Sequence, residues 1–265
     1  MKFKEFIYFR VIPNINRFLI LFSLKLVTSR TPNRNFQEFF QHLHSINYSV
    51  KTVIDVGVGK GTDTLYSGVG HADYILVEPV PDTRGVVQKI ADKLGGQFFN
   101  VAASDTDGET TFFLHEDITG SSLLKQLEKE EGLNGKEICV QTKRLDSIIS
   151  SSLRTPCILK LDTQGHEINV LKGAANLLRQ VDMIICEVSF HQFRQNAPEV
   201  ADIIIKMREY DYVPYEILEG HYRSVDNALA QVDIVFVKTN SSLRDINTFF
   251  SDQQAKEYLK TGKLS

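Results

Sequence analysis

Cysteine is scarce in this sequence, and its placement argues against a disulfide framework or a zinc site. The 265 residues include three cysteines, Cys139, Cys157 and Cys186. Each lies within an apolar run, and none has the spacing of a metal-ligand pair. We therefore expect buried, reduced thiols that pack as small hydrophobic side chains. Such thiols are typical of a reducing compartment, so the expected location is cytoplasmic.

An excess of positive charge is also missing. The chain has 30 Lys and Arg against 33 Asp and Glu, which gives a net charge of −3 at pH 7. A protein with general affinity for nucleic acid carries a basic surface that meets the phosphates. The composition therefore argues against nucleic acid as a partner.

The sequence has no apolar run of about 20 residues, the length that a membrane-spanning helix requires. Residues 18–24 are apolar, but Arg17 and Lys25 bound them, and no small-residue cleavage site of a signal peptide follows. Residues 1–34 contain seven Lys and Arg and a single acid. Two interpretations remain: a helix that packs on the domain or covers its active site, and a basic amphipathic anchor that makes the protein peripheral to an anionic membrane.

Apolar strand-like runs alternate with amphipathic helical stretches after residue 50. The expected strands are 52–56, 73–78, 97–102, 110–114, 138–145, 157–161, 182–188, 212–218 and 232–238. The expected helices begin at 62 and cover 81–94, the region around 123–131, 147–151 with Asp146 as its cap, 167–179 and 198–210. This alternation predicts an α/β protein with a mostly parallel open sheet and helices on both faces.

The segment between the last two expected strands, residues 221–231, has only weak helical periodicity. It resembles a hairpin return rather than a crossover helix, so we expect an antiparallel final strand. The predicted organisation is an N-terminal helical extension at 1–48, a main domain at 49–240 and a C-terminal helical tail at 241–265.

A glycine-rich turn follows the first expected strand. Gly57, Gly59 and Gly61 have no side chain, so the backbone there can pack closely against a ligand. Glu78 ends the next expected strand, about 20 residues further on, where a carboxylate can accept both hydroxyls of a ribose. Together these residues predict a pocket for a cofactor that contains adenosine.

The details of this turn favour S-adenosylmethionine over a nicotinamide dinucleotide. A dinucleotide requires Gly-x-Gly-x-x-Gly, because its pyrophosphate binds at a helix N-terminus, whereas Gly57 to Gly61 read Gly-x-Gly-x-Gly. Asp55 would repel a pyrophosphate, but it suits the cationic amino-acid or sulfonium group of S-adenosylmethionine. An NAD-dependent oxidoreductase on a related fold remains the alternative.

Other polar residues lie where the expected strands end, which is where ligands bind in an open α/β sheet. We expect Asp105, with Ser104 beside it, to contact the adenine amino group. Asp162 ends a buried strand and should face the cleft, because an unpaired buried charge is costly, and there it would contact cofactor or acceptor. His191 is the expected base that removes the proton of an acceptor hydroxyl, and His166 is the competing base.

Several neighbours of these residues allow more than one interpretation. Glu187 could orient either imidazole, and a set of four residues mixes the ligand types of a divalent-metal site: Asp162, His166, Glu187 and His191. No ligand spacing requires a metal, so we predict none. Glu167 is interpreted as the first-turn acid of a helix. Ser121 and Ser122 either line the acceptor side or cap a helix.

Five segments, in this order, resemble the FkbM-type methyltransferases, and the resemblance covers residues 50–190 closely and the chain to 238 more loosely. The segments are Val53-Ile-Asp-Val-Gly-Val-Gly-Lys-Gly-Thr-Asp-Thr64, Asn100-Val-Ala-Ala-Ser-Asp-Thr-Asp-Gly108, Thr119-Gly-Ser-Ser-Leu123, Thr142-Lys-Arg-Leu-Asp146, and Ile158-Leu-Lys-Leu-Asp-Thr-Gln-Gly-His-Glu167 with Val170-Leu-Lys-Gly-Ala174. The resemblance implies a class I methyltransferase fold with a Rossmann-like open sheet. It also implies S-adenosyl-L-methionine as cofactor and methyl transfer to an oxygen of a sugar, glycan or small-molecule acceptor.

The chain departs from this family at two positions. The family usually has Asn where Gly59 stands, a change that could shift the methionine end of the cofactor. It usually has Glu where Gln164 stands, and Gln removes a carboxylate near the expected active site. A non-catalytic relative that binds the cofactor is therefore a third interpretation.

Overall fold

The computed structural model describes residues 7, 11–19, 34–127 and 134–262. The chain divides into two compact units, Met1–Arg34 and Asn35–Ser265. The described part of the first unit includes helix α2 (Ile12–Leu19). Two interpretations were open for residues 1–34, packing on the domain and binding to a membrane surface. Most of these residues lie outside the described part of the chain. Among the described residues, no helix is long and apolar enough to cross a membrane.

Helix α3 (Phe36–Ser45) belongs to the second unit, so the division falls before the expected boundary at residue 48. Asn35 and Glu38 form a capping box at its start, since each side chain accepts a hydrogen bond from the other's backbone N–H. Its buried face consists of Phe36, Phe39, Phe40 and Leu43. These side chains join the same hydrophobic cluster as residues of the central sheet.

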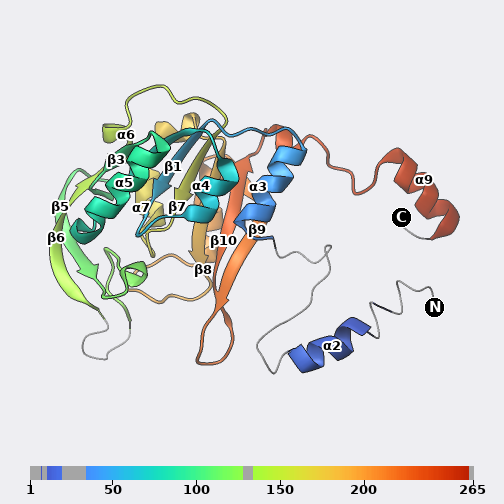
Figure 1. Ribbon diagram of the computed structural model, residues 1–265, viewed down its shortest axis with the longest axis horizontal. Coiled ribbons are helices and arrows are strands. Elements are labelled where there is room, and N and C mark those ends of the chain that lie inside the picture. Colours follow the sequence, from blue (N-terminus) through green and yellow to red (C-terminus); the bar gives the residue numbers. More distant parts are fainter. Residues whose placement is uncertain (1–6, 8–10, 20–33, 128–133, 263–265) are drawn as a thin grey trace. The chain divides into compact units, whose positions relative to one another are not determined.

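The central sheet has seven strands in the order β3-β2-β1-β7-β8-β10-β9 (Figure 1). Their bounds are β1 Thr52–Val56, β2 Asp73–Val77, β3 Gln97–Phe99, β7 Cys157–Leu161, β8 Met183–Ser189, β9 Tyr212–Tyr222 and β10 Leu229–Lys238. Strand β10 is antiparallel to both β8 and β9, which confirms the expected antiparallel final strand. The strand order reverses between β1 and β7, and in open α/β sheets ligands bind beside such a switch point.

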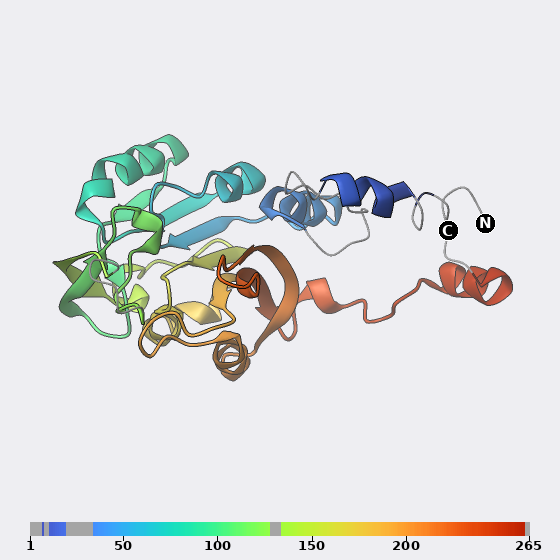
Figure 2. The same ribbon diagram turned by 90° about the horizontal axis from the view of Figure 1, so that it is seen from below.

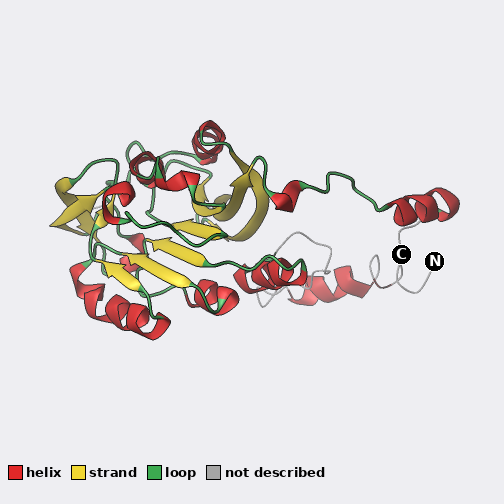
Figure 3. Ribbon diagram, turned by 90° about the horizontal axis from the view of Figure 1, so that it is seen from above, coloured by secondary structure: helices red, strands yellow, loops and turns green. Residues whose placement is uncertain are grey.

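Helices cover both faces of this sheet (Figures 2 and 3). One face packs against α3, α4 (Asp63–Val69) and α5 (Arg84–Leu94), which follows the 3₁₀ turn η3 (Pro81–Thr83). The other packs against α6 (Leu145–Ile148), α7 (Glu167–Gly173) and α8 (Val200–Glu209). Successive strand residues alternate between the two layers: Val53 packs with the first set of helices, whereas Ile54 packs with the second.

A separate three-stranded sheet, in the order β4-β6-β5, was not predicted. Its strands are β4 Ala102–Ala103, β5 Gly108–Leu114 and β6 Lys136–Lys143. The expected strand 97–102 divides at Asn100, whose side-chain amide donates to the Glu78 carbonyl at 2.8 Å. The chain pairs with β2 before this point and with β6 after it, so one expected strand contributes to two sheets.

Two expected helices differ in the structure. The described part of the helix expected around 123–131, residues 123–127, is not helical, and the rest lies outside the described residues. Helix α7 ends at Gly173 rather than at 179, and the 3₁₀ turn η5 (Leu177–Arg179) follows. Asp146, the expected cap of a helix at 147–151, lies within α6 and accepts hydrogen bonds from the backbone N–H groups of Asn176 and Leu177. It therefore holds the start of η5 instead.

The described C-terminal part contains the 3₁₀ turn η6 (Ser242–Arg244) and helix α9 (Asp252–Thr261). A 3₁₀ turn η4 (Ile118–Gly120) lies in the insert between β5 and β6.

Candidate active site

A cavity of about 560 Å³ lies at the carboxyl ends of β1, β2, β7 and β8. Its volume is within the range of pockets that bind small molecules and cofactors. The glycine-rich turn and the end of β2 form part of the wall, and the ends of β7, β8 and the β9–β10 hairpin form another part.

Gly57 is the position in the turn where only glycine fits. Its φ is +84°, and a Cβ atom there would lie 1.8 Å from the carbonyl oxygen of Asp162. Gly61 is similar, with a φ of +116° and a Cβ position 2.8 Å from a methyl group of Ile90. Gly59 has a φ of +57° but no atom within 4 Å of its Cβ position, so the Asn of related sequences has room there. All three glycines line the cavity, as predicted.

Glu78 also lines the cavity, and its carboxylate organises the turn. Oε2 accepts from the backbone N–H of Gly59 at 2.7 Å, and Oε1 accepts from that of Val80 at 2.9 Å. The side chain is buried, and burial raises its pKa to about 7, although both backbone hydrogen bonds lower it. Each carboxylate oxygen can accept a second hydrogen bond, so the residue retains capacity for ribose hydroxyls.

Asp55 does not line the cavity, and its predicted contact with the cofactor stays a prediction. It points to the α4 side of the sheet, where Oδ2 accepts from the hydroxyls of Tyr66 at 2.6 Å and Thr62 at 3.0 Å. Oδ1 is buried and has no hydrogen-bond partner among the described residues. Burial raises the pKa of Asp55, against the effects of Lys160 and of both hydroxyls. Through the Thr62 hydroxyl, Asp55 holds the chain directly after the glycine-rich turn.

Ser104 and Asp105 are also not in the cavity wall. The Ser104 hydroxyl contacts Asp105 Oδ1 at 3.2 Å and His166 Nε2 at 3.0 Å, and the Ser104 carbonyl packs against Gly173 of α7. The expected contact of Asp105 with an adenine amino group stays a prediction. An apolar wall stands nearby instead, formed by Val80, Ala102, Ala103, Phe112, Ile118 and Leu123.

The two histidines lie differently from what was expected for His191 as the base and His166 as its competitor. His191, the expected base, is not in the cavity wall, and its ring lies against Phe193 with the ring centres 5.9 Å apart. His166 does line the cavity, but it is buried between the Ser104 hydroxyl and the Asn169 amide. Burial lowers its pKa to about 4, so its imidazole is neutral at pH 7.

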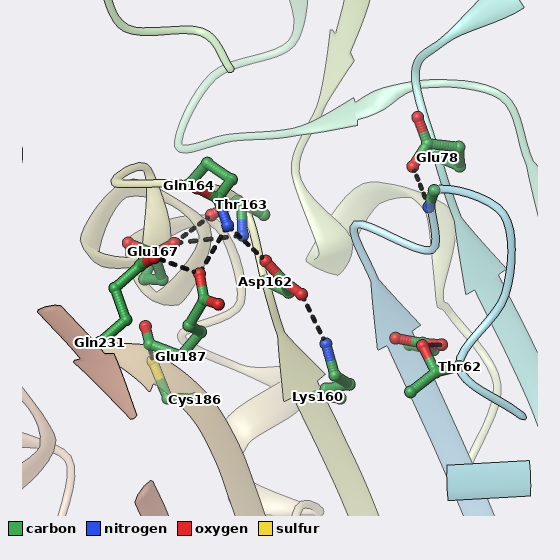
Figure 4. A network of polar contacts seen from close by, with 12 residues as sticks. Thr62, Glu78, Lys160, Asp162, Thr163, Gln164, Glu167, Cys186, Glu187 and Gln231 are labelled. Carbon is green, nitrogen blue, oxygen red and sulfur yellow. Dashed lines mark hydrogen bonds and ion pairs between the residues drawn. The ribbon is translucent and has the colours of Figure 1, made fainter. Parts of the chain in front are cut away.

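A polar cluster forms the opposite wall (Figure 4). Asp162 lines the cavity, as predicted, and its Oδ2 accepts from Lys160 Nζ at 3.0 Å. The Gln164 amide lies between two carboxylates, donating to Asp162 Oδ1 at 3.0 Å and to Glu187 Oε2 at 2.5 Å. Glu187 also accepts from Gln231 at 2.9 Å, so it holds two amides and orients neither histidine.

Burial and neighbouring charges shift the pKa values of Asp162, Lys160 and Glu187. Burial would raise the pKa of Asp162, but the Lys160 ammonium and the hydrogen bonds lower it below its usual range. The pKa of Lys160 is raised, because the carboxylates of Asp162 and Asp55 outweigh its burial. Burial together with Asp162 raises the pKa of Glu187 well above its usual range.

Residues near the cluster hold the turn after β7. Ser122 donates to the Gln164 carbonyl at 2.9 Å and accepts from the backbone of Leu124, while Ser121 lines the cavity. Glu167 is buried in the first turn of α7, as interpreted, and its Oε1 accepts from the backbone of Thr163 at 3.1 Å. These contacts support the left-handed backbone of Gln164, which has a φ of 55°.

Four ionisable residues of this wall were not predicted: Lys160, Glu219, His221 and Asp233. Lys160 interrupts an otherwise apolar strand and Asp233 lies between apolar residues of β10, and a charge at such a position is the signal that could have identified them. Glu219 and His221 lie in the part of β9 beyond the expected end of that strand. Among the described residues, no group of three or more His, Cys, Asp or Glu is arranged to hold a metal ion.

Comparison with known proteins places this arrangement in a family. The family model described as the methyltransferase FkbM domain matches residues 55–214. A curated relative, the hexuronic acid methyltransferase AglP of Haloferax volcanii, is 26% identical over 137 residues, which is 51% of this chain and 54% of that protein. The chain therefore spans about half the length of that relative.

Solved structures resemble the chain more distantly. The 1,6-didemethyltoxoflavin-N1-methyltransferase of Burkholderia thailandensis, bound to 1,6-didemethyltoxoflavin and S-adenosylhomocysteine, has a TM-score of 0.41 and 14% identity, over 77% of this chain and 78% of its own. The magnesium protoporphyrin IX methyltransferase of Synechocystis, bound to S-adenosylmethionine, has a TM-score of 0.39 and 12% identity, over 88% of this chain and 94% of its own.

The strand order, the glycine-rich turn and the buried acid at the end of β2 define a class I, Rossmann-like methyltransferase fold. The chain belongs to the FkbM methyltransferase family, whose model matches more than half of its length. S-adenosylmethionine is the cofactor of this family.

The cavity fits that cofactor. Because Gly57 has no Cβ atom, the turn can pack against the Asp162 carbonyl, and from this position Gly57, Gly59 and Gly61 line the cavity. In this fit Glu78 would offer its buried carboxylate to the ribose, and the apolar wall around Phe112 would accommodate a purine ring.

Proposed function

We propose that this protein transfers a methyl group from S-adenosylmethionine to a hydroxyl of a sugar, a glycan or another small metabolite. The observation that carries the proposal is the division of the cavity wall. The glycine-rich turn and Glu78 form a side suited to the cofactor. Lys160, Asp162 and Glu187 form a polar side suited to an acceptor with several hydroxyls.

The residues of the cofactor side have separable tasks. Glu78 would accept hydrogen bonds from the ribose hydroxyls while it holds the N–H of Gly59. The backbone from Gly57 to Gly61 would accommodate the methionine portion, and the apolar wall would bury the adenine. S-adenosylmethionine supplies an electrophilic methyl group bound to a sulfonium. Holding both reactants in one cavity would provide much of the acceleration.

The charge of the acceptor side favours a neutral or amino sugar over an acidic one. Asp162, Glu187, Glu219 and Asp233 stand against Lys160 and His221 in this wall, and Asp162 already pairs with Lys160. A carboxylate brought into such a site would be repelled, and the repulsion grows as water is excluded. The curated relative is a hexuronic acid methyltransferase, which supports a carbohydrate acceptor. The acidic wall argues that the favoured sugar differs from a hexuronic acid.

A product assay tests the proposal. The full chain is incubated with S-adenosylmethionine and the methyl glycosides of glucose, glucosamine or glucuronic acid, and S-adenosylhomocysteine and the methylated sugar are measured by mass spectrometry. We expect transfer to glucoside or glucosaminide to exceed transfer to glucuronide at least tenfold. Equal use of glucuronide would contradict the preference. Tight S-adenosylhomocysteine binding without turnover of any glycoside would favour the non-catalytic interpretation.

A further inference from the structure

Asp233 of β10 faces Glu187 of β8 directly across the antiparallel pair. Side chains opposite each other in such a pair have Cβ atoms about 5 Å apart, and like charges there are unfavourable. Both residues line the cavity. The sheet therefore places two carboxyl groups side by side in the acceptor wall.

The same face of the sheet carries more charge at its carboxyl end. Lys160 of β7 is in register with Asp55 of β1, and both side chains point toward the layer that contains α4. By the alternation of strand side chains, Glu187 and Asp233 point toward the same side as Ile185 and Val235, which pack in that layer. A row of ionisable groups therefore crosses four strands beneath the cavity.

The carboxylates of this wall differ in what their oxygens already bind. Asp162 is held by Lys160 and Gln164, and Glu187 is held by two amides. Asp233 Oδ1, in contrast, is buried and accepts no hydrogen bond from any residue that the structure describes. A buried polar atom without a partner costs free energy, so its position in a cavity wall indicates a group that a ligand satisfies.

The neighbours of Asp233 set its charge. Burial raises its pKa to about 6. The positive charges of Lys160 and His221 lower this pKa, whereas the carboxylates of Asp162 and Glu219 raise it further. The opposing carboxyl group, Glu187, has its pKa raised well above the usual range, in part by Asp233. With a pKa of about 6, Asp233 is mostly ionised at pH 7 and can accept a proton.

We propose that Asp233 binds the acceptor hydroxyl and receives its proton during methyl transfer. This role rests on the proposed function. As the acceptor oxygen forms its bond to the methyl carbon, the O–H bond breaks and the proton passes to the Asp233 carboxylate. The electron pair of the broken carbon–sulfur bond remains on sulfur. The products are a methyl ether and S-adenosylhomocysteine, and Asp233 then releases the proton to solvent.

Other groups suit this task less well. His191 is outside the cavity wall, and His166 is occupied by Ser104 and Asn169. Asp162 is already neutralised by Lys160. The family model ends at residue 214, before β10 begins, so its match does not include Asp233.

Carbon-13 NMR of protein labelled at the aspartate carboxyl tests the assignment without turnover. The Asp233 resonance is identified by its absence from Asp233→Asn, and Asp73→Asn, at an exposed ion pair, is the control variant. In the S-adenosylhomocysteine complex we expect this resonance to titrate near pH 6 and to shift when methyl glucoside is added. Titration near pH 4 with no response to the glycoside would overturn the proposal.

Kinetics with the best glycoside of the panel separate this role from a structural one. Asp233→Asn should lower kcat about 10²- to 10⁴-fold. Its S-adenosylhomocysteine affinity, measured by calorimetry, should stay within twofold of wild type. The acidic limb of the pH profile near pH 6 should disappear, and Asp233→Glu should recover part of the rate. An Asp233→Asn variant with wild-type kcat and pH profile would overturn the role of Asp233 alone, whereas a wild-type protein without transfer to any glycoside would overturn the proposed function as well.

Discussion

The ammonium of Lys160 lies 3.0 Å from Asp162 Oδ2, with the lysine side chain 5% exposed and the aspartate side chain 32% exposed. Lys160 is in register with Asp55 on the neighbouring strand, and Asp55 and Asp233 also raise its pKa. One cation therefore compensates several carboxylates at the carboxyl end of the sheet.

Replacing this lysine should strongly destabilise the protein. In Lys160→Met the carboxylates of Asp55, Asp162 and Asp233 lose their shared counter-charge, and removal of one partner from a buried ion pair typically costs about 3–5 kcal/mol. Urea unfolding at pH 7 measures the loss of stability. Lys89→Met, at an exposed position of α5, is the control. The additional change Asp162→Asn should recover part of it. A Lys160→Met variant with wild-type stability would contradict the arrangement.

Restoring the family's usual residue at position 164 should also destabilise this chain. The Gln164 amide donates to two carboxyl groups, and Gln164→Glu replaces both donors with a further acid beside Asp162 and Glu187. We expect a loss of about 1–3 kcal/mol at pH 8, shrinking toward pH 5 as the new acid and its neighbours bind protons. Thermal unfolding at both pH values measures this, and Gln253→Glu at an exposed position of α9 should have no such pH dependence. An equal loss at both pH values would argue against charge repulsion as the cause.

The glycines of the turn should respond differently to side chains. Gly57→Ala places a Cβ atom on the Asp162 carbonyl at a φ of +84°, so we expect a stability loss above about 2 kcal/mol and weaker S-adenosylhomocysteine binding. Gly59→Asn enters open space at a φ that Asn adopts readily, so its melting temperature should stay near that of wild type. Differential scanning calorimetry compares the two. A large drop for Gly59→Asn would indicate a different turn conformation.

Cofactor affinity should depend on the ionisation of Glu78. Burial raises its pKa to about 7, so the folded protein without cofactor binds a proton more tightly than the unfolded chain does, and its stability falls as the pH rises from about 4.5 to 7. Ribose hydroxyls donate to the ionised carboxylate, so affinity should increase with pH through 7 and then level off. Calorimetry with S-adenosylhomocysteine from pH 5.5 to 8 measures this increase.

Two variants complete that experiment. Glu78→Gln cannot accept from Gly59 and Val80 with both side-chain atoms, so it should bind S-adenosylhomocysteine at least about tenfold more weakly, with a flat pH dependence. Glu116→Gln, at an exposed position, should match wild type. If Glu78→Gln retained full affinity, the ribose would have to bind elsewhere in the cavity.

The sequence predicted those site residues whose positions depend on local backbone geometry. Gly57 and Glu78 directly follow apolar strands, and the carboxyl end of a strand determines where such residues lie. Asp55 does not line the cavity, because its carboxylate is held by the hydroxyls of Tyr66 and Thr62. Strand alternation alone could not have shown this, since Lys160 and Asp233 point to the same side of the sheet and do line the cavity.

Other features depend on contacts between distant segments. His191 follows β8 by only two residues, but the turn there pairs Phe190 with Ala230 and leaves the imidazole outside the cavity wall. Asp233 gains its importance from register with Glu187, 46 residues away, which no local pattern contains. The second sheet likewise depends on the pairing of β4 with β6 across the insert.

The β9–β10 hairpin contributes Glu219, His221 and Asp233 to the cavity, yet it lies almost entirely after residue 214, where the family match ends. The wall that we propose for the acceptor therefore combines Lys160, Asp162 and Glu187 from inside the family match with hairpin residues from outside it. Exchanging the hairpin between relatives would test which of these two parts selects the acceptor.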